Sequence, residues 1–189
     1  MAADLVAWAA SVAYRAGQFS RAVTARPEAD SAQELSTILP PDALRLFFAM
    51  PANDQRHARA VYAWLSAGEG ERPRRPGQRR ALLQAALLHD VGKADAALTL
   101  WHRVAIVLLR AWRPDLLEQL ANDQPGAWGY PFWLHLHHPA RGAALAASAG
   151  CDRLAVVLIR RHQDALPATW QGTDKAGLWQ ALKEADDRT

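Results

Sequence analysis

Cysteine is nearly absent from the sequence, with Cys151 the one thiol among 189 residues. A single cysteine excludes an internal disulfide framework and is typical of proteins that fold in a reducing compartment. We therefore expect a cytoplasmic location and a fold held together by its apolar core. Half of the residues are apolar, which is enough for one domain with a sizeable core.

The chain also lacks a strong excess of charge of one sign. It carries 22 Lys and Arg against 19 Asp and Glu, a formal net charge of +3. Such a small excess does not imply a nucleic-acid partner. The arginines of residues 68–77 are not interleaved with aromatic residues that would stack on bases, so we interpret them as a solvated loop.

Long apolar runs are missing as well. An apolar stretch near the N-terminus follows Asp4 and stops at Arg15, short of the roughly 20 residues that a membrane span needs. We interpret it as an amphipathic helix packed on the protein, without a membrane role.

Runs of alternating β-branched residues are absent, and apolar residues recur at spacings of three and four, which predicts an all-α fold. We expect residues 1–50 to form a helical extension packed on a core domain of residues 51–189. Trp64, Trp101 and Trp179 lie at positions typical of core or helix packing. The expected helices cover residues 3–19, 31–37, 42–49, 53–67, 77–91, 96–111, 114–122, 139–149, 152–163 and 174–187.

Several histidines and aspartates fall on the apolar faces of these helices. His57 is in register with apolar residues four, seven and eight positions later, His89 and Asp90 end an apolar helix, and His162 and Asp186 lie on apolar faces of their own. One inward histidine is usually an ordinary core residue. Buried carboxylates, however, cost several kcal/mol unless they are paired or bind a cation. Mixed nitrogen and oxygen ligands favour Mn, Fe, Co, Ni or Zn over Ca.

The same residues resemble the motifs of the HD superfamily of metal-dependent phosphohydrolases. Residues 89–93, His-Asp-Val-Gly-Lys, resemble its HDxGK signature, and His57 before them and Asp186 after them complete the H…HD…D order. Residues 138–143, His-Pro-Ala-Arg-Gly-Ala, resemble the HPxxGA element of dinuclear members, in which His162 also has a counterpart. The resemblance spans roughly residues 53–187 and implies a compact HD-domain helical bundle with extra N-terminal helices.

The resemblance also implies a ligand set for one or two divalent transition-metal ions. Asp90 would bridge the two ions and take part in catalysis. The remaining ligands would be His57, His89 and Asp186 for the first ion, and His138 and His162 for the second. His135 and His137 are candidates to orient these ligands, and Asp164 is an alternative ligand.

The predicted activity is hydrolysis of a phosphoester or phosphoanhydride, in a small and nucleotide-like substrate, by a metal-activated water. Lys93 would offer a positive charge to a phosphate or orient Asp90, and Arg141 and Arg161 are further candidates to contact the substrate. Two alternatives keep the fold: a non-catalytic HD-like signalling or interaction module, and a di-iron oxygenase of the HD type.

Overall fold

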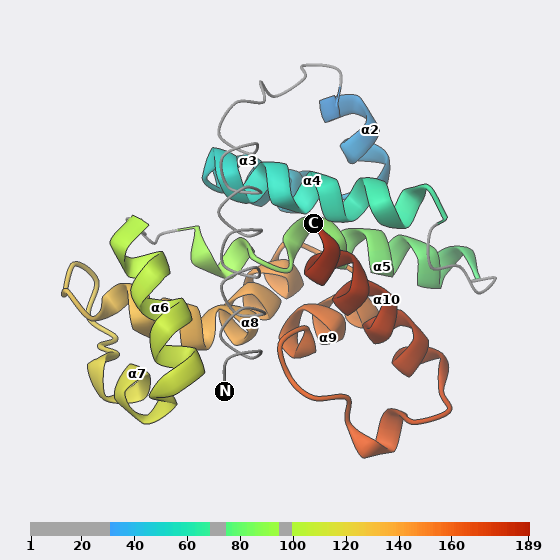
Figure 1. Ribbon diagram of the computed structural model, residues 1–189. Coiled ribbons are helices and arrows are strands. Elements are labelled where there is room, and N and C mark those ends of the chain that lie inside the picture. Colours follow the sequence, from blue (N-terminus) through green and yellow to red (C-terminus); the bar gives the residue numbers. More distant parts are fainter. Residues whose placement is uncertain (1–30, 69–74, 95–99) are drawn as a thin grey trace.

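The computed structural model describes residues 31–68, 75–94 and 100–189 of the chain (Figure 1). Every regular element in these ranges is a helix, which confirms the all-α prediction. The expected helix 3–19 and the start of the expected helix 96–111 lie outside the described residues. The elements are α2 (Ser31–Ile38), α3 (Pro41–Ala49), α4 (Ala52–Ser66), α5 (Pro76–Leu88), η1 (Val91–Lys93), α6 (Leu100–Trp112), α7 (Pro114–Leu120), α8 (Tyr130–Ser148), α9 (Arg153–Arg161), η2 (Ala168–Trp170) and α10 (Asp174–Arg188).

Proline and glycine mark several of the helix boundaries. Proline occupies the first turn of α3, α5, α7 and α8, where the missing N–H has no helical partner to lose. Gly150 adopts a positive φ of 78° directly after α8, a conformation that favours glycine and ends the helix. These residues therefore turn the chain sharply between neighbouring helices.

Helix α5 lies at the centre of the main bundle. It contacts α4, α9 and α10, and it also contacts α2 and α3, which precede it in the sequence. All of its residues from Ala81 to Leu88 are buried, and all of them except Gln84 are apolar. Because α5 is surrounded in this way, its C-terminal end lies in the interior of the protein. His89 and Asp90, which follow this end, are therefore buried.

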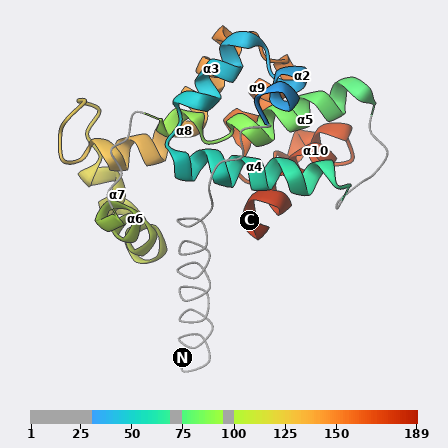
Figure 2. The same cartoon turned by 90° about the horizontal axis from the view of Figure 1, so that it is seen from above.

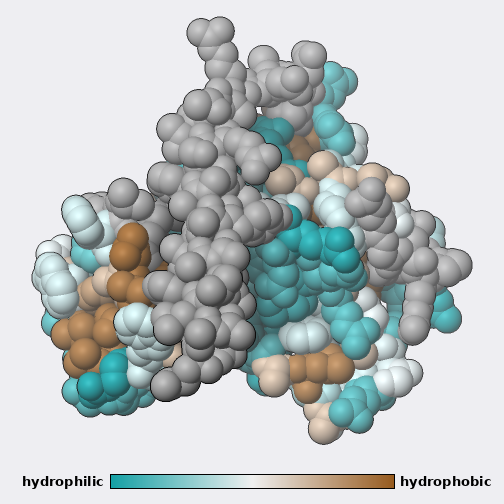
Figure 3. Space-filling view, in the orientation of Figure 1, coloured by the Kyte–Doolittle hydropathy of each residue, from teal (hydrophilic) through white to brown (hydrophobic). Residues whose placement is uncertain are grey.

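A smaller apolar cluster lies at one end of the molecule, where α6 and α7 pack beside the first half of α8 (Figures 1 and 2). Ile106, Leu117 and Phe132 are buried there. Figure 3 shows hydrophobic residues gathered on the surface over α6 and α7. The expectation that Trp101 is a packing residue was wrong, since it is 80% exposed on α6. The small cluster buries only one side of that helix.

Helix α8 differs most from its predicted bounds. The sequence predicts a helix over residues 139–149, with Pro139 in its first turn. The helix begins instead at Tyr130 and continues through Pro139 to Ser148. No helix among the described residues is long and apolar enough to cross a bilayer.

Candidate metal centre

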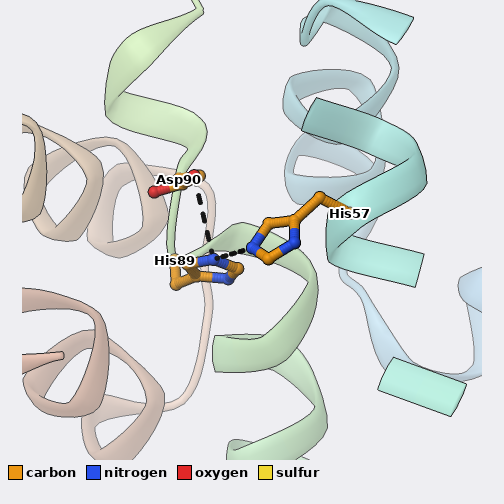
Figure 4. Close-up of side chains that lie close together, drawn as sticks. All are labelled: His57, His89 and Asp90. Carbon is orange, nitrogen blue, oxygen red and sulfur yellow. Dashed lines mark hydrogen bonds and ion pairs between the residues drawn. The ribbon is translucent and has the colours of Figure 1, made fainter. Parts of the chain in front are cut away.

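Six histidine and aspartate side chains meet in the middle of the bundle, and they come from five different helices or from the residue or two that follow them. Figure 4 shows three of them, His57, His89 and Asp90, facing one another. Two sets of three have ligand atoms within 4.8 Å of one another. The six are His57 on α4, His89 and Asp90 after α5, His138 on α8, His162 after α9, and Asp186 on α10.

Asp90 stands between two groups of histidines and offers one carboxylate oxygen to each. Its Oδ1 lies 3.3 Å from Nε2 of His138 and 3.8 Å from Nε2 of His162. Its Oδ2 lies 3.8 Å from Nε2 of His89 and accepts a hydrogen bond of 2.8 Å from Nζ of Lys93. We call His138 and His162, with Oδ1 of Asp90, the sealed cluster.

The second group, which we call the open cluster, consists of His57, His89 and Asp186 with Oδ2 of Asp90. Oδ1 of Asp186 lies 2.9 Å from Nε2 of His57 and 3.5 Å from Nε2 of His89. The two histidine Nε2 atoms are 3.3 Å apart. The side chains of His57 and Asp186 are 29% and 25% exposed, so solvent reaches this cluster between α4 and α10.

Three of the histidines are held by hydrogen bonds from Nδ1 to a backbone carbonyl three residues earlier. Since a carbonyl oxygen can only accept, Nδ1 carries the proton in each ring. The bonds run from His89 to Ala86 at 2.9 Å, from His138 to His135 at 2.7 Å and from His162 to Ile159 at 2.8 Å.

In His138 and His162 these bonds leave the Nε2 lone pairs directed at the centre of the site. Nε2 of His138 and Nε2 of His162 are only 3.3 Å apart, and in two neutral rings no hydrogen lies between them. Two nitrogens bound to one ion at about 2.1 Å in tetrahedral geometry would be separated by about 3.4 Å. The donor atoms and their spacing therefore fit a metal ion.

Burial keeps the two histidine rings of the sealed cluster uncharged. It lowers the pKa of His162 to about 3, and burial together with the charge of Lys93 lowers the pKa of His138. Their side chains are 1% and 0% exposed. Both rings are consequently neutral at physiological pH, which is the form that binds metals.

The open cluster holds a proton when no cation is bound. Burial lowers the pKa of His89, but the carboxylates of Asp90 and Asp186 outweigh it and raise the pKa to about 9. Burial likewise acts to raise the pKa of Asp186, yet hydrogen bonds with His57 and His89 lower it. The pKa of Asp90 is also held well below its usual value, against burial, by Lys93 and His89. Both carboxylates are thus anionic and ready to bind a cation.

Close packing between η1 and α8 brings residues 89–93 into contact with residues 138–143. A Cβ on Gly92 would collide with the carbonyl oxygen of His138 and lie 2.8 Å from the backbone nitrogen of Gly142. Glycine is therefore needed where the turn after Asp90 touches α8. Nη1 of Arg141 also donates to the Gly92 carbonyl at 2.8 Å. Arg141 is predicted from the sequence to contact the substrate, and no local pattern in the sequence indicates this contact with Gly92.

Other candidates lie further from the centre. Arg161 and Asp164 form an ion pair of 2.7 Å with each other, and about half of each side chain is exposed. His137 packs against Trp133, with ring centroids 4.7 Å apart. His135 takes part through its backbone, because its carbonyl orients His138. Burial lowers the pKa of the His135 ring to about 3, so that ring is neutral.

No protein family, curated protein or solved structure matches this chain. The structure establishes an all-helical fold in which buried histidine and aspartate groups are positioned to hold a metal ion. This arrangement is compatible with an HD-type domain.

Proposed function

We propose that the protein is a metal-dependent phosphohydrolase of the HD type, which cleaves a phosphoester or phosphoanhydride in a nucleotide-like substrate with water as the nucleophile. The observation that carries the proposal is the position of Asp90. It presents one oxygen to the sealed cluster and the other to the open cluster, as a carboxylate that bridges two cations would.

The donor set favours a transition metal. Four imidazoles and two carboxylates form a mixed nitrogen and oxygen site, which suits Mn, Fe, Co, Ni or Zn. Two such ions, when bound, supply positive charge for an in-line displacement at phosphorus and lower the pKa of a water toward neutrality. The protein contributes the anionic carboxylates, neutral rings and a buried position where these charges act strongly.

A substrate would approach on the side of the open cluster. The partly exposed side chains of His57 and Asp186 leave that side accessible, whereas His138 and His162 are enclosed. Lys93 has the best support among the candidate phosphate ligands, because Nζ lies 2.8 Å from Asp90 and the side chain is 17% exposed. Its ammonium can exchange part of its contact with Asp90 for a phosphate oxygen.

Metal analysis combined with a substrate screen tests the proposal. Purified protein should contain about two transition-metal ions per chain and hydrolyse phosphate esters, nucleotides or dinucleoside polyphosphates when Mn, Co, Ni or Mg is added. His57→Ala and Asp90→Ala should lose metal and activity. A matched control is His102→Ala, because His102 packs against Phe132 in the smaller cluster.

Two outcomes would replace the proposal. A metal-free protein with full stability and no hydrolytic activity would point to an interaction module. Consumption of oxygen with an organic substrate, supported by Fe and lost with Mn, would point to an oxygenase. Hydrolysis that depends on added metal and on Asp90 would exclude both.

A further inference from the structure

Pro139 lies well inside α8, is buried, and does not interrupt the helix. Proline has no backbone N–H, and in a regular helix that N–H would bond to the carbonyl four residues earlier. The carbonyl of His135 is therefore left without its ordinary helical partner. A proline in this position is unfavourable for the helix itself, but it leaves a carbonyl free to accept a side-chain donor.

The His135 carbonyl accepts the hydrogen bond from Nδ1 of His138, at 2.7 Å. The rings of His89 and His162 make the same kind of bond, but their carbonyl acceptors lie at a different place in the helix. Ala86 and Ile159 lie in the last turns of α5 and α9, where carbonyls have no helical partner in any case. His138 is far from the end of α8, so the proline next to it creates inside a helix what the other two histidines find at a helix end.

We propose that Pro139 is a positioning residue for the metal centre: by leaving the His135 carbonyl without a backbone donor, it fixes the tautomer and direction of His138. The ring is then held with Nε2 toward Asp90 and His162, at 3.3 Å from each. This inference rests on the metal-binding part of the proposed function and adds to it the residue that orders the sealed cluster. It requires nothing of the substrate.

Pro139→Ala tests the idea, because alanine returns an N–H that competes for the His135 carbonyl. Titration of metal-free protein with Co or Zn should show that affinity for the ion of the sealed cluster falls about tenfold or more, as when other groups that orient metal ligands are removed. Affinity for the ion of the open cluster should not change. The unfolding midpoint of the metal-free variant should not fall, since alanine suits a helix better than proline.

Pro114→Ala is the matched control. Pro114 occupies the first turn of α7, where its N–H would have no helical partner, and the substitution should leave both metal affinities unchanged. A carbonyl oxygen has two lone pairs, so the His135 carbonyl has room for two donors. If Pro139→Ala left the affinity for the ion of the sealed cluster unchanged, the His135 carbonyl would be accepting from both the new backbone N–H and Nδ1 of His138. That result would overturn the proposal.

A second measurement needs neither metal nor the variant. Nitrogen NMR of the histidine rings in metal-free wild-type protein should show His138 protonated on Nδ1, with the proton in a hydrogen bond. A ring protonated on Nε2 would contradict the proposal even if Pro139→Ala failed to fold. If the wild-type protein bound no metal at all, the proposed function would fall, while the tautomer of His138, compared between the wild type and Pro139→Ala, would still test the role of Pro139.

Discussion

The two halves of the candidate metal centre share Asp90 but differ in their access to solvent. The sealed cluster is enclosed, and both of its rings are tied to backbone carbonyls and neutral. The open cluster contains the partly exposed pair His57 and Asp186, and its buried His89 is protonated when no cation is bound. The sealed half is thus already organised for an ion, whereas the open half must release a proton. Among the described residues of the site, those of the open half are the more exposed.

Asp90→Ala should have the largest effect, because it removes the one residue common to both halves. We expect loss of both ions and a fall of kcat/KM by about three orders of magnitude or more, since charge stabilisation and water activation would both be lost. Metal content and steady-state kinetics measure this. Asp187→Asn is the control, because Asp187 is exposed and pairs with Lys183 on the far side of α10. An Asp90→Ala protein that kept two ions would show that the halves are independent.

Single histidine variants separate the halves. His162→Ala should lose the ion of the sealed cluster and retain the other, whereas His57→Ala should do the reverse, and each should lower kcat/KM by about a hundredfold. Metal analysis after dialysis against a weak chelator measures the stoichiometry. If both variants lost both ions in equal measure, the six residues would form one indivisible site, and the distinction between the clusters would disappear.

The pH dependence should differ between the halves, and His89 sets its direction. Its pKa is about 9 in the folded protein, above the ordinary value of 6.5. Its contribution to the stability of the metal-free protein is therefore fully present below pH 6.5 and lost as the pH rises through about 9. Affinity for the ion of the open cluster should rise over the same window, because that ion displaces the His89 proton.

Urea unfolding in the presence of a chelator, repeated from pH 6 to pH 10, measures the stability, and metal titration over the same range measures the affinity. His89→Gln should remove the slope in stability. A slope that survives this substitution would assign the titration to another group. The sealed cluster, with its neutral rings, should bind its ion with little change across this range.

The helical pattern was sufficient to predict the fold class and most of the helices, because amphipathic periodicity follows directly from packing on a core. It failed at the start of α8, where Pro139 suggested a boundary and tertiary packing carried the helix through it. It also failed for Trp101, because periodicity marks an apolar face without showing what covers it.

The site was partly accessible to the same reasoning. Inward register predicted that His57, His89 and Asp186 point into the core, and the order of motifs grouped them with His138 and His162. The structure brings these residues together around Asp90. What one sequence does not contain is the contact between Gly92 and α8, the carbonyl acceptors of the three rings, and the difference in exposure between the halves. All of these arise from the way separate helices meet.

Lys93→Met should have the smallest effect. It tests whether the Lys93 ammonium, beside the open cluster, contacts the phosphate of the substrate. The substitution removes a charge that pairs with Asp90 without removing a predicted metal ligand, so both ions should remain bound. We expect kcat/KM to fall about tenfold, with partial recovery in Lys93→Arg, which restores the charge with a different shape. A fall in kcat/KM that comes with loss of metal would mean that Lys93 acts only through Asp90. A fall with both ions retained, and largest for the most highly charged substrates, would place its ammonium against the phosphate.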